Sequence, residues 1–235
     1  MSDFQSILAA AFGLITSGDP DLFAVIGLSL QVTVTAVALS CLIGFPLGAM
    51  VGAFRFPGRT LISITLNALM GLPPVVVGLM VYLMLSRSGP LGPLGLLYTP
   101  TAMIIAQTLL VTPIVAALTK QVVEDLDREY SDHFRSLRVR AMDRVAALLW
   151  DARYSLLTVA LAGFGRAVAE VGAVLIVGGN INHVTRVMTT TIALETSRGN
   201  LQMALALGII LMGMAFVVNA IVLSLRSSAA RAAYA

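Results

Sequence analysis

Long segments without a single charged residue are the feature that most constrains what this chain can fold into. No charged side chain occurs in the segments 22–54, 60–86 and 199–225. Two further apolar segments, 100–119 and 154–177, are also long enough for membrane helices. A helix of about 20 apolar residues crosses the hydrocarbon core of a bilayer. The sequence therefore predicts an all-α polytopic membrane protein.

The composition excludes an ordinary soluble protein. Of the 235 residues, 58% are hydrophobic and only 11% are charged, whereas about 25% of the residues in a soluble domain are charged. Intrinsic disorder is also excluded, because it requires low hydrophobicity and a high net charge. We expect five transmembrane helices, at about residues 22–54, 60–86, 100–119, 154–177 and 201–225.

The distribution of basic residues predicts the orientation in the membrane. Five spans place the termini on opposite sides, and a cytoplasmic C-terminus puts 11 Lys and Arg residues inside and 3 outside. Because cytoplasmic loops carry an excess of basic residues, we expect the N-terminus outside and the tail 226–235 inside. The external segment 1–21 has apolar residues at helical spacing from Phe4 to Ile15, which favours a short helix lying on the membrane surface.

The second apolar segment contains a sequence that interrupts a helix. Gly71 is followed by Leu72, Pro73 and Pro74, and neither proline has a backbone N–H to donate. A broken helix inside a bilayer is tolerated only where it is buried in protein or lines a wet cavity. Two interpretations remain open for Gly71, Pro73 and Pro74, namely a packing kink and a gate or pathway element.

The first apolar segment carries three glycines at four-residue spacing, Gly44, Gly48 and Gly52. Small residues at this spacing let helix backbones approach closely. The sequence allows two partners for this face, a helix of the same chain or a second copy of the chain.

The fourth span contains the one pair of charged residues expected inside the membrane, Arg166 and Glu170. Their spacing places both on one face of a continuous helix. Each would cost roughly 2.5–3.5 kcal/mol at the bilayer centre, so both should face protein or water. We expect them to pair with each other or with a neighbouring helix and to fix the fourth span, and a direct functional role is the alternative.

The segment 120–153 is the one sizeable polar region of the chain. It includes seven basic and seven acidic side chains. Mixed charges at helical spacing favour exposed helices, and a cytoplasmic loop of this size predicts a protein partner.

The motifs of several enzyme classes are missing from the sequence. The only lysine, Lys120, is followed by Gln121, so the chain has no P-loop for a nucleotide. The two histidines, His133 and His183, fall on opposite sides of the membrane in the expected topology, and Cys41 is the only cysteine. The sequence therefore predicts no metal site and no enzymatic activity of the chain itself.

Residues 164–173, with the sequence F-G-R-A-V-A-E-V-G-A, resemble a segment of the permease subunits of bacterial ABC importers for oxyanions. The E-A-A…G loop that precedes this segment in the family falls on Asp132, His133, Phe134 and Arg138. Further segments resemble the tungstate permeases of that family; they are residues 72–79, 86–92, 96–107, 177–181 and 189–196.

This resemblance implies the type I ABC importer permease fold in a bacterial cytoplasmic (inner) membrane. Two copies of the chain would form the translocation pathway, and two cytoplasmic ATPase subunits, which hold the ATP and magnesium, would dock on the polar loops. An external binding protein would deliver tungstate. The chain is expected to bind lipid but no nucleic acid, and to have no cofactor of its own.

The resemblance and the polar loop together locate the contact with the ATPase. We expect a short helix, seated in a groove of that subunit, at Asp132, His133, Phe134, Arg135, Ser136, Leu137, Arg138, Val139, Arg140, Ala141 and Met142. For the anion itself, the candidates are the break at Gly71–Pro74 and hydroxyl groups near the two-fold axis, because a transported ion needs donors that do not bind it too strongly.

There are three alternatives to a tungstate importer subunit. A stand-alone secondary transporter often shows internal repeats, and this sequence shows none. An intramembrane enzyme would need a nucleophile or metal motif. Molybdate in place of tungstate is the third alternative, because both are tetrahedral dianions of nearly the same size.

Overall fold

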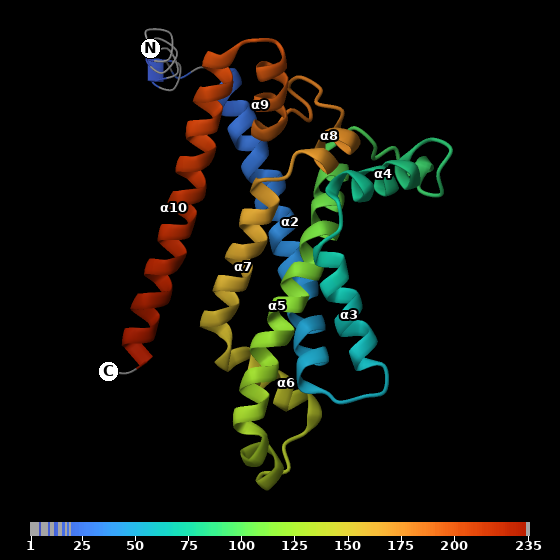
Figure 1. Ribbon diagram of the computed structural model, residues 1–235, viewed down its shortest axis with the longest axis vertical. Coiled ribbons are helices and arrows are strands. Elements are labelled where there is room, and N and C mark those ends of the chain that lie inside the picture. Colours follow the sequence, from blue (N-terminus) through green and yellow to red (C-terminus); the bar gives the residue numbers. More distant parts are fainter. Residues whose placement is uncertain are drawn as a thin grey trace. The chain divides into compact units, whose positions relative to one another are not determined.

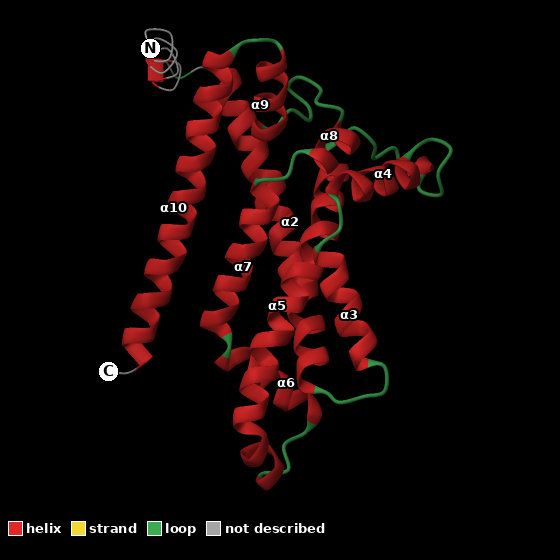
Figure 2. Cartoon of the chain, viewed as in Figure 1, coloured by secondary structure: helices red, strands yellow, loops and turns green. Residues whose placement is uncertain are grey.

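The computed structural model describes residues 5, 9, 12–13, 16, 18 and 20–233, with side chains as far as Ser224. These residues form helices joined by loops and no strands (Figure 2). In chain order the elements are α2 (Pro20–Ala53), α3 (Arg59–Met70), α4 (Pro74–Leu85), a 3-10 turn η1 (Gly92–Leu94), α5 (Pro100–Ser136), α6 (Ala141–Asp151), α7 (Arg153–Val168), α8 (Gly172–Gly178), α9 (Met188–Ser197) and α10 (Leu201–Ala233) (Figure 1). The predicted all-α class is confirmed.

Among the described residues, three helices are long and apolar enough to cross a membrane by themselves, namely Pro20–Ala53, Pro100–Ser136 and Leu201–Ser224. Two bent pairs, α3 with α4 and α6 with α7, raise the number of possible spans to five if each pair is one broken span. The five expected spans fall within this range, and the orientation of the chain stays a prediction. The expected surface helix between Phe4 and Ile15 lies mostly outside the described residues.

The chain divides into two compact units, each built from three separate segments. The first unit comprises Met1–Thr35, Pro73–Gln107 and Ala167–Val218, and the second comprises Ala36–Leu72, Thr108–Arg166 and Asn219–Ala235. The long helices α2, α5, α7 and α10 each contribute residues to both units.

The first unit has an apolar cluster around the start of α2, α9 and the first half of α10. Leu22, Met188 and Leu207 are buried there, with Met203 and Leu211 among the half-buried residues packed around them. These contacts position α9 beside two long helices of the same unit.

The second unit is built on a close contact between α2 and α5. A Cβ atom added to Gly44 would lie 2.7 Å from Cγ1 of Val115, and one added to Gly48 would overlap the carbonyl oxygen of Ala116. A Cβ atom added to Gly52 would lie 2.8 Å from the carbonyl oxygen of Lys120 in α5. The glycine face of α2 therefore packs within the chain, and the first of the two interpretations of these glycines is confirmed.

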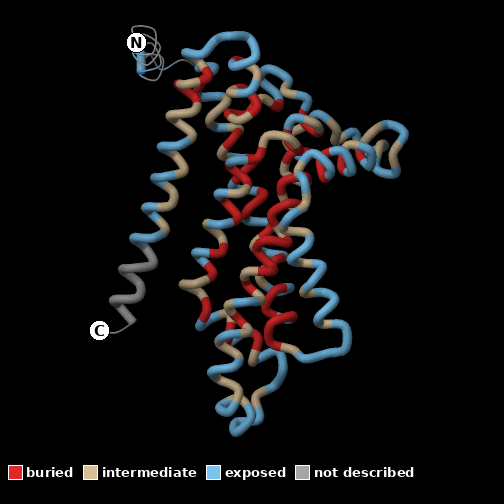
Figure 3. The backbone as a smooth tube through the Cα atoms, in the orientation of Figure 1, coloured by how far each residue is buried: buried red, intermediate tan, exposed pale blue. Residues whose placement is uncertain are grey.

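Helices α5 and α10 differ strongly in how far their residues are buried. Buried residues follow α5 along most of its length, whereas α10 carries mainly half-buried and exposed residues (Figure 3). In the most apolar 18-residue windows, 61% of the residues are buried in α5 and 11% in α10. The apolar surface of α10 is thus available to lipid or to another chain.

Candidate functional site

The first interruption of a membrane helix lies at Gly71–Pro73, between α3 and α4. The N–H of Gly71 donates to the carbonyl of Ala68 at 3.1 Å, which closes α3. Pro73 is extended (φ −62°, ψ 124°), and Pro74 is the first residue of α4. Proline suits the first helical position because its missing N–H would have no helical partner there. The break that the sequence predicts at Gly71, Pro73 and Pro74 is confirmed.

A second interruption lies at Ala169–Val171, between α7 and α8. The sequence predicts one continuous helix over 154–177, and that prediction is wrong, because α7 ends at Val168 and α8 begins at Gly172. Glu170 lies in the break, so Arg166 and Glu170 do not share a face of one helix. Arg166 is half-buried in the last turn of α7, where a positive charge is favourable. Their expected pairing with each other or with a neighbouring helix stays a prediction.

Side chains from α5, from α9 and from the break itself hold the second break in place. Nε2 of Gln107, on α5, donates to the carbonyl of Ala167 at 3.2 Å. Oγ1 of Thr189, on α9, donates to the backbone carbonyl of Glu170 at 2.9 Å. Oε1 of Glu170 accepts from the N–H of Ala173 at 3.0 Å, in the first turn of α8. The break is therefore fixed by specific hydrogen bonds, which give partners to the carbonyls of Ala167 and Glu170 and to the N–H of Ala173.

The two helices that follow the breaks pack against each other in the first unit. A Cβ atom added to Gly78 of α4 would lie 2.7 Å from Cα of Ala173 in α8. A Cβ atom added to Gly172, the first residue of α8, would lie 2.8 Å from Cγ2 of Val75. Because glycine alone allows this approach, the start of α8 lies directly against the start of α4. The structure thus brings the beginnings of both half-helices together.

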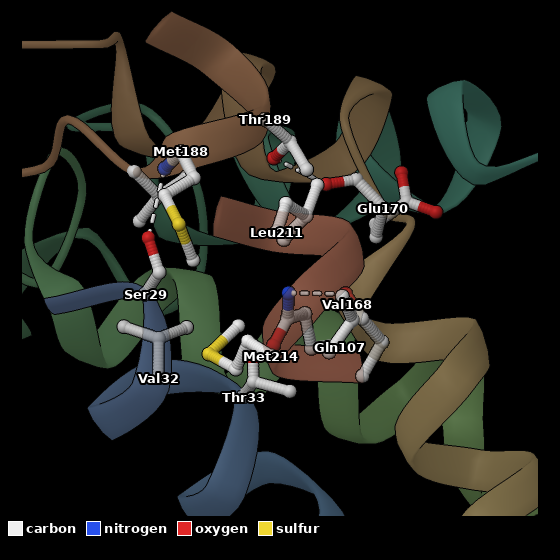
Figure 4. A pocket seen from close by; sticks show the side chains of 12 residues that line it. Ser29, Val32, Thr33, Gln107, Val168, Glu170, Met188, Thr189, Leu211 and Met214 are labelled. Atoms are coloured by element: carbon white, nitrogen blue, oxygen red, sulfur yellow. Dashed lines mark hydrogen bonds between the residues drawn. The ribbon is translucent and has the colours of Figure 1, made fainter. Parts of the chain in front are cut away.

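A small cavity lies beside the second break (Figure 4). Its volume is about 20 Å³, and its polar lining includes Ser29, Thr33, Gln107 and Thr189. The Ser29 hydroxyl accepts from the N–H of Met188 at 2.8 Å, which ties α2 to the start of α9. Apolar side chains of α10 complete the lining.

Sequence reasoning missed the polar residues around this break. Gln107, Ser29 and Thr33 are uncharged and lie within apolar segments, so they did not stand out beside Arg166 and Glu170. The usable signal was Gln107, since a buried amide in a membrane helix requires partners for its donors and its acceptor.

The predicted contact region with an ATPase, Asp132–Met142, is not a single short helix. Helix α5 continues to Ser136, residues 137–140 form a turn, and α6 begins at Ala141. That part of the prediction is wrong, because the helix of the third span does not end at the expected edge of the membrane. The turn is exposed, and 74% of the Leu137 surface is accessible.

Arg138 lies in the turn with a left-handed backbone conformation. Its φ angle is +51°, a region that glycine adopts without steric penalty and other residues adopt rarely. The glycine of the E-A-A…G loop described above falls on this position. The observed backbone explains why glycine suits that position.

Aromatic and ionic contacts hold α6 against the end of α5. Nε of Arg144 donates to Oδ1 of Asp127 at 2.6 Å, and the Arg144 guanidinium lies 5.6 Å from the ring centre of Phe134. Tyr130 packs edge-on against Phe134, with 6.1 Å between the ring centres. A groove of about 650 Å³ lies beside these contacts, and five arginines are among the residues that line it: Arg55, Arg128, Arg135, Arg138 and Arg144. The turn therefore presents apolar and basic side chains on a fixed support.

Glu124 joins the charged part of α5, beyond the apolar run that ends at Thr119, to the start of α3. Its carboxylate lies 3.3 Å from the Arg59 guanidinium, 3.4 Å from Nζ of Lys120 and 2.8 Å from Arg128. Burial raises the pKa of Glu124, but the neighbouring positive charges outweigh this effect and lower the pKa below its ordinary value.

Comparison with known proteins assigns this arrangement to a family. The family described as "Binding-protein-dependent transport system inner membrane component" matches residues 44–230. The chain is 42% identical over 217 residues to the tungstate uptake system permease protein TupB of Peptoclostridium acidaminophilum, covering 92% of this chain and 95% of that protein.

Two further relatives have related names. A probable anion ABC transporter permease protein of Haloferax volcanii is 40% identical over 205 residues, which cover 85% of this chain and 88% of that protein. The tungstate uptake system permease protein TupB of Campylobacter jejuni is 37% identical over 166 residues, which cover 71% of this chain and 70% of that protein. All three relatives are named as permease proteins for an anion.

Proposed function

This chain belongs to the family of binding-protein-dependent transport system inner membrane components, and we propose that it is the membrane subunit of an ATP-driven importer of tungstate. Its fold is that of the type I ABC permeases, and it is a multi-pass protein of the inner membrane. The observation that carries the proposal is the 42% identity to a tungstate uptake permease over 95% of that protein's length.

The energy for uptake would come from a separate subunit. The sequence contains no nucleotide-binding motif, and the family is one of transport subunits. We propose two cytoplasmic ATPase subunits, each docked on the turn between α5 and α6. Exposed Leu137 and Met142 suit an apolar groove on the ATPase, and the arginines beside them suit acidic side chains around that groove.

Two copies of the chain would enclose the anion pathway, because the described residues provide at most five spans, which leave little room for a sealed path within one copy. Closed two-fold dimers are also the commonest oligomers. An external binding protein would capture the anion and select it, since the pathway must release a tetrahedral dianion as readily as it accepts it. The helix break at Ala169–Val171 is the proposed moving part of this pathway, and the break at Gly71–Pro73 is its proposed fixed part.

The test is uptake of tungstate by liposomes that contain this chain, its ATPase and its binding protein. We expect ATP-dependent accumulation of tungstate that requires all three proteins. Molybdate should compete with tungstate to an extent that follows the relative affinities of the binding protein for the two anions. Accumulation by this chain alone, driven by an ion gradient, would identify a secondary transporter and refute the proposal.

The docking surface can be tested in the same preparation. Leu137→Glu should remove most of the ATP hydrolysis that the loaded binding protein stimulates, because a charge replaces an apolar contact. Trp150→Ala is the matched control, since Trp150 is equally exposed but lies outside Asp132–Met142. Normal stimulation in the Leu137 variant would place the ATPase elsewhere.

A further inference from the structure

The amide side chain of Gln107 is buried and only half satisfied. It is 4% exposed, and its Nε2 donates to Ala167 at the end of α7. Its Oε1 accepts no hydrogen bond from any residue of the described part of the chain. A buried acceptor without a donor is strongly unfavourable, and proteins usually satisfy such atoms with a side chain or an ordered water.

The cavity beside Gln107 has the size and the lining for one water molecule. A water needs at least about 10–15 Å³ of cavity volume and two to four polar partners, and this cavity has a volume of about 20 Å³. The hydroxyl-bearing residues Thr33 and Ser29 line it together with Gln107, and Leu211 and Met214 of α10 provide apolar cover.

The unpaired acceptor makes the transported anion a poor match for this cavity. A tetrahedral oxyanion is several times larger than a water molecule. All of its oxygens accept hydrogen bonds, so it cannot satisfy Oε1 of Gln107, which is itself an acceptor. The occupant must donate a hydrogen bond, and a water does so.

We propose that this cavity is a binding site for a single water molecule, and that Gln107 with its bound water positions the second helix break for transport. Gln107 holds the last turn of α7 by one amide atom and the water by the other. The water joins this amide to the polar residues of α2, while Thr189 holds the break from α9. The helix break is thereby tied to three other elements of the first unit, and the role in transport rests on the function proposed above.

A density map of the assembled importer, at a resolution that shows waters, tests the binding site directly. We expect one peak about 2.7–3.2 Å from Oε1 of Gln107 and a second polar neighbour from α2. A map of that quality without a peak overturns the proposal. So does a peak at about 2.3–2.6 Å with several oxygen neighbours, because that is a distance for a metal cation.

A double-mutant cycle tests the positioning role. Gln107→Met keeps the length of the side chain and removes its polar atoms, and Thr33→Val keeps the shape of the threonine. Each should reduce the maximal rate of ATP hydrolysis stimulated by the tungstate-loaded binding protein by roughly tenfold, a change equivalent to about 1.4 kcal/mol. The concentration of binding protein that gives half of the maximal rate should not change, because the docking surfaces are intact.

The cycle has a specific expected outcome. Because both side chains hold the same water, the double variant should be no worse than the single variants. Additive losses would show that no shared water links them, and a change in the half-saturating concentration alone would overturn the positioning role. Gln202→Met and Thr35→Val are the matched controls, since both residues are exposed.

Failure of this inference can be told apart from failure of the proposed function. If the unmodified complex shows no stimulated ATP hydrolysis, the importer assignment fails, whereas the density map still decides whether the water is bound. If Gln107→Met does not assemble, the conservative Thr33→Val variant decides the positioning role.

Discussion

The two helix breaks differ in what causes them. At Gly71–Pro73 the chain leaves the helix because two consecutive prolines remove backbone donors, and the next helix starts on Pro74. At Ala169–Val171 there is no proline, and the break is held by hydrogen bonds from Gln107, Glu170 and Thr189. The first break is a local property of the chain, and the second depends on residues of α5 and α9.

This difference has a consequence for transport. A break made by proline persists whatever its surroundings do, because proline lacks a backbone N–H in its covalent structure. A break held by side chains can change when its partners move, since each hydrogen bond contributes only about 0.5–1.5 kcal/mol. We therefore expect the second break to be the responsive one and the first to be the fixed one.

The largest expected effect comes from the contact that joins the helices after both breaks. Gly78→Leu should destabilise the protein by about 3 kcal/mol, because the new side chain meets the backbone of Ala173 at 2.7 Å from the added Cβ. Thermal unfolding of the purified protein measures the change. Gly208→Leu is the matched control, since a Cβ atom there meets nothing within 4 Å; equal losses in both variants would refute the close contact.

A smaller effect should be confined to the second break. Glu170→Leu removes the acceptor for the N–H of Ala173 and should cost about 1–3 kcal/mol, whereas Glu170→Gln keeps an acceptor of the same length and should lose less. Unfolding midpoints of the two variants provide the comparison. If the two are equally destabilised, the negative charge of Glu170 matters more than this hydrogen bond.

Changes at the first break should be smaller still. Replacing both Pro73 and Pro74 by alanine should lower stability by about 1 kcal/mol, chiefly by giving the unfolded chain more freedom. Limited proteolysis or helix content by circular dichroism would show whether α3 then extends into α4. An unchanged break in this variant would mean that packing, and not proline, produces it.

The smallest effect concerns the turn between α5 and α6, which is a third interruption of the helical chain. Arg138→Gly should raise stability by up to about 1 kcal/mol, because glycine adopts the observed φ of +51° without steric penalty. The unfolding midpoint again measures the effect. Arg135→Gly is the control, because Arg135 is helical and glycine there should lower the unfolding midpoint. A higher midpoint in the Arg135 variant would contradict the explanation from the backbone angle of Arg138.

The sequence allowed the elements with local signals to be predicted. The first span, expected at 22–54, corresponds to α2 at Pro20–Ala53, and α10 begins at Leu201 as expected. The proline break was predictable for the same reason. Each of these features depends on hydropathy or on a residue that restricts its own backbone.

Two features were not predicted: the second break, which depends on contacts between distant residues, and the true end of α5. Helix α5 was expected to end near Thr119, where the apolar run ends. A helix does not have to end where it leaves the bilayer, and α5 continues to Ser136. Lys120, Glu124 and Arg128 are spaced to form ion pairs along the helix, and no glycine or proline follows before Gly163. The second break was missed because Gln107 and Thr189 are distant from it in sequence.

Hydrogen–deuterium exchange at the two breaks tests the central comparison most directly. In the Gln107→Met variant, amide exchange should rise in residues 167–175 and stay unchanged in residues 69–77. In the variant with alanine at positions 73 and 74, exchange should change in residues 69–77 and not in 167–175. Equal changes at both breaks in either variant, or no change at 167–175 when Gln107 is replaced, would contradict the account.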